Sequence, residues 1–162
     1  MTIRHWIANS KGQAIVEFSL IFPLLCVLVG AAVDWGMALF VTQVAQNAAR
    51  EGARKASVMQ NPGTGSCTVP NCSSESAGSP LKQVADVLPN SNLFTGFTVT
   101  NLGVLDPGGN SCVGGAGIAT CGCEVEIRIA GTYSFFFLRL LGFSNSSFTR
   151  SSKMRWELVP LC

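Results

Sequence analysis

The hydrophobic pattern at the start of the chain is a long uncharged segment behind a short basic stretch. No charged residue lies between Glu17 and Asp34, and none lies between Asp34 and Arg50. With the flanking apolar residues, this pattern predicts roughly 25 residues of helix, about enough to cross a bilayer core with some tilt. Pro23 is compatible with this prediction, because a membrane helix tolerates the kink that a proline introduces. We therefore expect a transmembrane helix over residues 13–41.

The helical pattern continues beyond the apolar segment as a stripe of small residues. One helix over residues 14–58 would be about 68 Å long, so half of it would stand clear of a bilayer. Alanine and glycine let neighbouring backbones approach closely, so we interpret residues 42–59 as helix that packs against other helices. The alternative is that the stripe packs on the outer part of this same chain. The stripe comprises Val41, Val44, Ala45, Ala48, Ala49, Gly52, Ala53 and Ala56.

The charges and the cysteines indicate which end of the helix faces outward. Arg4 and Lys11 precede the apolar segment, and positive charge at this place favours the cytoplasmic side. Six of the seven cysteines lie beyond the segment, which is typical of disulfides in an oxidising compartment. Cys26 lies inside it and is interpreted as a small buried hydrophobe. Cys67 and Cys72 are close enough to pair locally, and the other pairings stay open. The disulfide candidates are Cys67, Cys72, Cys112, Cys121, Cys123 and Cys162.

The rest of the chain predicts a small α+β domain. Residues 60–80 are rich in glycine, proline and serine, which predicts a loop. Ser79 and Pro80 suit the N-cap and first turn of a short helix from Leu81 to Leu88. We expect residues 81–162 to combine this helix with an antiparallel sheet stabilised by disulfides.

Three segments have the composition and alternation of strands. They are Phe97–Thr100, Cys123–Ala130 and Phe148–Leu158, and residues 103–122 are the expected long loop between two of them. The stretch Tyr133–Leu141 is the most apolar run outside the membrane helix, but it is too short to span a bilayer. We interpret it as part of the core, in preference to an exposed patch that touches lipid or another subunit.

Candidate chemistry is sparse. The only histidine, His5, lies in the basic stretch before the helix, so an outer domain freed of that stretch would hold neither a Ser–His nor a Cys–His pair. Glu124 and Glu126 share one face of a predicted strand, which we interpret as a solvated face. Residues 114–117 lack the strand and helix that flank a nucleotide-binding loop. With a net charge of +2 and no basic stripe, nucleic-acid binding is also excluded.

The pair Cys121 and Cys123 leaves one alternative open. Two thiols one residue apart could bind a soft metal or exchange disulfides, in a membrane-anchored extracytoplasmic redox or metal-binding domain. Zinc sites usually have wider spacing, however, and no histidine is available to complete one. We therefore favour structural disulfides to Cys112 or Cys162, and we expect no enzyme activity, cofactor or metal.

The start of the apolar helix reads Gly12-Gln13-Ala14-Ile15-Val16-Glu17-Phe18. A glycine followed five residues later by a glutamate, between a basic stretch and an apolar helix, resembles the class III signal of type IV-like prepilins. The resemblance implies a leader over residues 1–12, cleavage after Gly12 by a prepilin peptidase, and Gln13 as the new N-terminus. Glu17 would then pair with the terminal amine of a neighbouring subunit and set the axial register. The alternative is that Glu17 lies at the headgroup level, where the helix dipole favours a carboxylate.

A wider resemblance covers the first third of the chain. The runs GQAIVEFSLIFPLL and DWGMALFVTQVAQNAAREGARKAS are similar to the TadE-like proteins, minor pseudopilins of the tight-adherence (Tad, or Flp) pilus system. Phe18 stands where the pilin motif commonly has tyrosine, which is a conservative aromatic change. The residues that carry the resemblance are Gly12, Glu17, Phe18, Pro23, Gly36 and residues 48–54.

This resemblance implies a minor pilin that takes part in the assembly or initiation of the pilus through helix packing and protein–protein contacts. The implied partners are other pilins and pseudopilins, the pilus assembly platform, the prepilin peptidase and membrane lipid, with no small-molecule substrate. We expect a single-pass inner-membrane protein with a cytoplasmic N-terminus and an extracytoplasmic C-terminal domain. A membrane-anchored adhesin or envelope protein that enters no filament is a further alternative.

Overall fold

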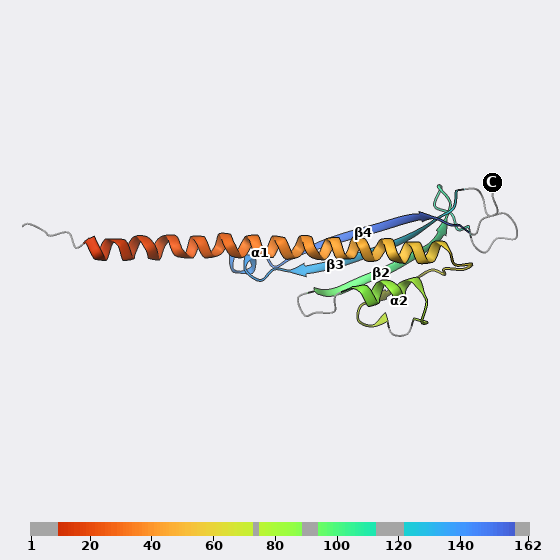
Figure 1. Cartoon of the computed structure of the whole chain (residues 1–162), viewed down its shortest axis with the longest axis horizontal. Helices are drawn as coiled ribbons and strands as arrows, with labels where there is room; N and C mark the ends of the chain where they lie inside the picture. The colour runs from red at the N-terminus through yellow and green to blue at the C-terminus, as the bar shows by residue number, and fades with distance from the viewer. Residues whose placement is uncertain (1–9, 73–74, 89–93, 113–121, 158–162) are drawn as a thin grey trace, which may run out of the picture.

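The structure, a computed structural model, describes residues 10–72, 75–88, 94–112 and 122–157. One long helix, α1 (Ser10–Ser57), extends along the molecule, and the other elements lie beside its second half (Figure 1). The α+β architecture predicted from the sequence is confirmed. The other elements are β1 (Gly65–Thr68), α2 (Pro80–Val87), β2 (Phe94–Leu105), β3 (Glu124–Ser134), the 3-10 turn η2 (Leu138–Leu141) and β4 (Asn145–Arg155).

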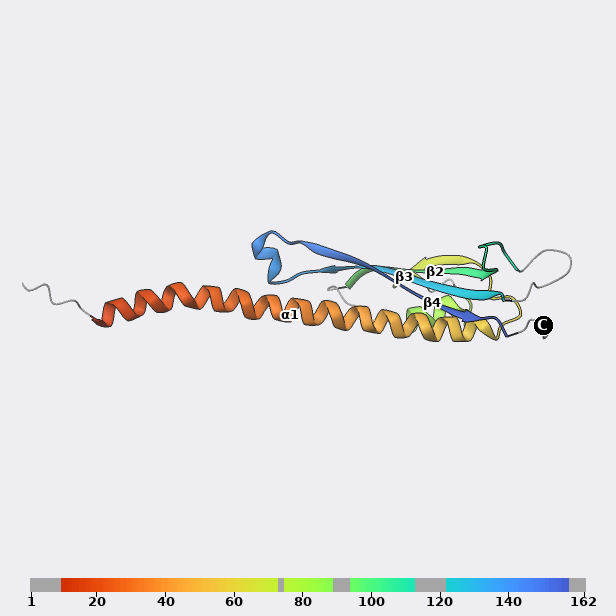
Figure 2. The ribbon, with the colours of Figure 1, turned by 90° about the horizontal axis from the view of Figure 1, so that it is seen from above.

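The α1 helix has 48 residues and continues through Pro23 without a break. Among the described residues it is the one helix long and apolar enough to cross a membrane, in agreement with the predicted span. Its first half carries large apolar side chains on all sides, and the sheet does not extend over most of it (Figure 2). Exposed examples are Ile15, Leu20, Leu25, Val29 and Val33.

The four strands form an antiparallel sheet in the order β1-β2-β3-β4. Strand β3 is central to it and pairs with β2 on one side and with β4 on the other. Its Val125, Ile127 and Ile129 are fully buried, which confirms the face predicted from their alternation. Figure 2 shows the sheet lying along α1, so this apolar face is covered by the helix.

The strands are longer than the sequence pattern indicates. The predicted strand Phe97–Thr100 is the middle of β2, which extends to Leu105 and so into the predicted loop. Gly96 and Gly103 have φ of +78° and +81°, and each lies where the β2–β3 register shifts. These are β-bulges, in which a glycine adopts a left-handed conformation and the strand continues beyond it. A glycine that reads as a loop signal therefore lies inside the sheet.

The prediction of an uninterrupted loop over residues 60–80 is wrong, because strand β1 lies inside it. The four residues of β1 pair with Thr98–Asn101 of β2 at the edge of the sheet. Three of the four are exposed, so the segment has no apolar alternation that could have revealed a strand. It is held instead by backbone pairing and by a disulfide between Cys67 and Cys72.

The short helix α2 confirms its predicted start. The Ser79 side chain accepts a hydrogen bond from the Lys82 N–H at 3.1 Å, and Pro80 occupies the first turn. Leu81 and Val84 are buried, and Val84 lies against α1 at Gly52. The cap directs the helix so that its apolar face closes one side of the core.

The stripe of small residues on α1 packs on the chain's own sheet and α2. Its interpretation as a face for other subunits is therefore wrong, and the alternative holds. A flat apolar sheet face needs a cover, and small side chains let the helix backbone approach it closely. Six members have no exposed surface, and a Cβ on Gly52 would collide with Val84 Cγ2. The fully covered residues named in the sequence analysis are Val41, Ala45, Ala48, Ala49, Ala53 and Ala56, with Val44 half-buried.

Two disulfides cross-link the described part of the domain. Cys67 pairs with Cys72, and Cys112 pairs with Cys123 across 11 residues. Closing loops this short contributes about 2–3 kcal/mol each in the chain-entropy model. Cys121 and Cys162 lie outside the described residues. Cys26 is exposed on the first half of α1, so its interpretation as a buried residue is wrong.

The closeness of α1 to α2 leads to a first prediction. Gly52→Ala should lower the free energy of unfolding by about 1–3 kcal/mol, because the added methyl group collides with Val84 in the closed core. Denaturant unfolding of the full chain in detergent micelles measures the change. Gly36→Ala is the matched control: its Cβ would meet no atom within 4 Å, so it should stabilise the helix by up to about 1 kcal/mol. Equal stability of the two variants would contradict the close packing at Gly52.

Candidate assembly surface and its anchor

The residues predicted for processing and register lie together at the start of α1. Gln13 Nε2 donates a hydrogen bond to Glu17 Oε1 at 3.0 Å, one turn further along the helix. Both side chains are exposed, and a Cβ on Gly12 would meet no atom within 4 Å. Phe18 is 65% exposed and stacks on Phe22 with ring centroids 5.4 Å apart. All of them are therefore accessible to another protein.

Most of the exposed large apolar residues of the described chain lie on the apolar first half of α1. Leu20, Leu24 and Leu28 are each at least 60% exposed, although they are neighbours on the helix. Water does not stabilise such a surface, so it requires either lipid or the helices of other subunits. The structure thus divides α1 into a bare apolar half and a half with one face covered by the outer domain.

Asp34 anchors the outer domain to α1. Its Oδ1 accepts a hydrogen bond from the Phe136 N–H at 3.0 Å, and its Oδ2 accepts from the N–H groups of Phe137 and Leu138 at 2.8 and 2.7 Å. The Tyr133 hydroxyl donates to Oδ1 at 3.5 Å. The carboxylate therefore ties the loop between β3 and β4, at the start of η2, to the middle of the long helix.

This role of Asp34 was missed from the sequence, where the residue only marks an end of the apolar segment. Its side chain is 1% exposed. A buried carboxylate is costly unless several donors compensate the loss of water, and charge-assisted hydrogen bonds are the strongest available. The signal that could have revealed it is the isolation of one carboxylate in an uncharged run, because such groups rarely lack a specific partner.

Aromatic packing surrounds the anchor. A Cβ on Gly30 would lie 2.5 Å from Phe137 Cγ, so this ring lies directly on the helix backbone one turn before Asp34. Trp35 and Phe135 have ring centroids 6.3 Å apart, and Phe135 also meets Tyr133 edge to face at 5.4 Å. Core packing, the interpretation favoured for residues 133–141, is thus correct for Tyr133 and Phe135. It is wrong for Phe136, Leu140 and Leu141, which are more than half exposed.

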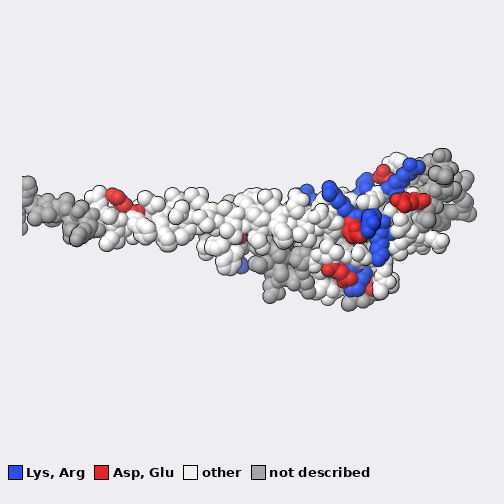
Figure 3. Space-filling model, viewed as in Figure 1, with Lys and Arg blue, Asp and Glu red and all other residues white. Residues whose placement is uncertain are grey.

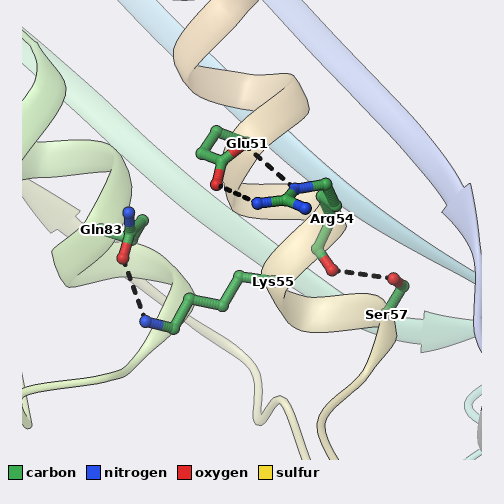
Figure 4. A network of polar contacts seen from close by, with 5 residues as sticks. All are labelled: Glu51, Arg54, Lys55, Ser57 and Gln83. Carbon is green, nitrogen blue, oxygen red and sulfur yellow. Dashed lines mark hydrogen bonds and ion pairs between the residues drawn. The ribbon is translucent and has the colours of Figure 1, made fainter.

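The outer end of α1 carries a polar network (Figure 4). The Arg54 guanidinium donates to both carboxylate oxygens of Glu51, at 2.9 and 3.2 Å, and this hydrogen bonding lowers the pKa of the Glu51 carboxyl. Lys55 Nζ donates to Gln83 of α2 at 3.0 Å, and Ser57 Oγ donates to the Arg54 carbonyl at 2.8 Å. The Glu51–Arg54 pair is exposed and contributes little to stability. The bond to Gln83 adds a directional link between the two helices.

The outward face of the sheet differs from its prediction at one residue. Glu124 is exposed as expected, but the Glu126 side chain is only 11% exposed. Its two oxygens meet Arg128 at 3.1 Å and Lys153 of β4 at 3.5 Å. The antiparallel pairing of β3 with β4 places Lys153 directly opposite Glu126, so the two charges compensate each other across the strands.

The described residues hold no cluster of three or more His, Cys, Asp or Glu side chains that could bind a metal ion. Cys123, one of the two thiols required by the redox or metal-binding alternative, is engaged in the disulfide with Cys112. No structural feature of the described chain therefore favours that alternative.

The chain matches one family model. Residues 12–54 match the model described as TadE-like protein, which confirms the resemblance inferred from the sequence. The matched region begins at the glycine of the predicted cleavage site and ends within the polar network at the outer end of α1. It therefore contains the exposed start of the helix, the bare apolar half, Asp34 and the small-residue stripe. No curated protein and no solved structure matches the chain.

The anchor gives a second prediction. Asp34→Ala should cost about 3 kcal/mol of stability, because the amides of Phe136, Phe137 and Leu138 lose a charged acceptor. Hydrogen exchange followed by mass spectrometry on the full chain in micelles should show faster exchange over these residues. The matched control is Glu17→Ala, which removes an exposed carboxylate from the same helix and should leave that exchange unchanged. Unaltered protection in Asp34→Ala would contradict the anchoring role.

Proposed function

The chain is TadE-like over residues 12–54, and we propose that it acts as a minor pseudopilin in the assembly or initiation of a tight-adherence pilus. The observation that carries this proposal is the division of α1. One half is apolar and uncovered, whereas the other half has one face buried against the chain's own domain. A helix of this kind can enter a bundle of similar helices through its bare half and present a preformed domain on the outside.

The membrane is the first environment of the bare half. The basic residues Arg4 and Lys11 favour a cytoplasmic N-terminus, so the helix crosses the inner membrane and the domain lies outside the cytoplasm. The disulfides Cys67–Cys72 and Cys112–Cys123 agree with this orientation, because disulfides persist in oxidising compartments. The same apolar surface that contacts lipid can later contact neighbouring helices, because side-chain packing replaces acyl chains.

Glu17 supplies the register of assembly. Cleavage after Gly12 would leave Gln13 with a free ammonium group. In an apolar bundle, the carboxylate of one subunit would pair with the ammonium of the next, since each charge is costly without the other. In the isolated chain Glu17 has an exposed hydrogen-bond partner in Gln13, which such an ion pair can replace.

The outer domain provides the specific contacts. Its charged side chains gather over the end of the molecule away from the N-terminus, whereas most of the first half of α1 has none (Figure 3). Because the domain is packed and anchored on α1, the position of the helix in a bundle also fixes the position of the charged surface.

Pairing by Glu17 gives a third prediction. Glu17→Ala should insert into the membrane as the unaltered chain does, but its incorporation into pili should fall by about tenfold or more, equivalent to about 1.4 kcal/mol or more. Quantitative immunoblotting of sheared pili and of membranes measures both quantities. Ser19→Ala, which removes an exposed polar side chain that bonds the Ile15 carbonyl of the same helix, should be incorporated normally. Normal incorporation of Glu17→Ala would rule out the pairing role.

Processing gives a fourth prediction. The mature protein extracted from membranes should begin at Gln13, as determined by mass spectrometry of the intact chain. Gly12→Val should retain the leader and stay out of the pilus while its domain folds normally, since Gly12 has open space around it. Normal hydrogen exchange in the domain would verify the fold. A mature N-terminus at another residue would disprove cleavage at this site.

A further inference from the structure

We propose that the loop between β3 and β4 is a second membrane-contacting element, seated among the acyl chains of the outer leaflet beside α1. We call residues 135–144 the hairpin tip. This inference rests on the membrane placement of α1 proposed above. It adds a lipid-binding surface in the outer domain, far along the chain from the TadE-like region.

The hairpin tip exposes an unusual concentration of large apolar side chains. Leu140 is 81% exposed, which makes it the most exposed large hydrophobic residue among those described, although it belongs to a folded turn. Contiguous exposed apolar residues of this size mark a contact surface. The exposed residues of the hairpin tip are Phe136, Phe137, Leu140, Leu141 and Phe143.

The height of the tip along α1 favours lipid as its partner. Asp34 and Gly30 fix the tip to the helix at a level where Val29 and Val33 are also exposed. From Ile15 to Asp34 the helix rises about 29 Å, close to the thickness of a hydrocarbon core. A membrane that covers the bare helix from Ile15 onward therefore reaches the hairpin tip.

The backbone of the tip is prepared for an apolar environment. The N–H groups of residues 136–138 donate to Asp34, and those of Phe135, Leu140 and Phe143 donate to carbonyls within the tip. Gly142 closes the turn with φ of +93° and donates to the Arg139 carbonyl. A loop at membrane depth requires such internal pairing, because no water is present there to replace it.

The distribution of charge agrees with this position. Between Arg128 and Arg150 the sequence holds one charged residue, Arg139. Arg139 is exposed on η2, where its long side chain can reach the phosphate groups while its methylenes stay with the apolar residues. Trp35 lies beside the tip and is 58% exposed, as expected of an aromatic side chain at the membrane interface.

Two attachments would hold the outer domain at a fixed angle to the membrane. The helix alone permits rotation about its axis. A lipid-embedded tip on one side of the helix restricts this rotation, so the charged end of the sheet faces a constant direction before assembly.

Site-specific photocrosslinking tests the proposal. The photoreactive residue p-benzoylphenylalanine replaces Leu140 or Phe143 in the full chain, expressed alone in membranes that contain no other pilin. Leu25 reports on the membrane helix, and Val58, an exposed apolar residue just beyond the outer end of α1, is the matched control. After irradiation, mass spectrometry identifies the adduct at each position. We expect lipid adducts in similar yield at positions 140, 143 and 25, and no lipid adduct at position 58.

Each other outcome has a distinct meaning. A lipid adduct at Leu25 with none at Leu140 and Phe143 would overturn the inference and leave the membrane placement of α1 intact. A protein adduct at these tip positions, including a second copy of the chain, would overturn it in favour of a protein partner. Loss of lipid adducts at all the positions would overturn the membrane placement and the inference together.

Discussion

The hydrogen bonds from Asp34 to the amides at the start of η2 hold the outer domain in register on the long helix. Contacts between alanine or glycine and an apolar sheet are non-directional, so they alone would tolerate a slip by one helical turn. A slip of about 5.4 Å would leave the carboxylate buried without donors. The cost of that state selects one position of the sheet, and every contact further along α1 follows from it.

Once the domain is fixed on α1, its small-residue stripe is no longer available to other molecules. Gly52 shows how completely it is used, because no side chain fits between the helix and Val84. The uncovered half of α1 is then the part of the helix that can enter a bundle. In the proposed assembly, a neighbouring subunit can therefore pack on this half of α1 without disturbing the core.

The elements that the sequence predicts well are those whose own residues determine them. The periodicity of α1 and the cap of α2 are local, and the alternation of β3 reports its buried face directly. The edge strand β1 could not be predicted, because its pairing with β2 depends on residues far along the chain. The same holds for the partner of the small-residue stripe: alanine permits close packing on a sheet or on a helix, and only the folded chain distinguishes them.

The same distinction between local and long-range determinants applies to the candidate site. The spacing of Gly12 and Glu17 was recognisable because both residues belong to one short linear motif, and the match to the TadE-like model covers them. The partners of Asp34 were not recognisable, since they are backbone amides, which every sequence contains. Its location also affects its strength. In the proposed placement beside lipid, water is excluded from the carboxylate, so the hydrogen bonds act in a low dielectric and are stronger than in solution. The environment that the bare half of α1 requires is thus the one in which the anchor is most effective.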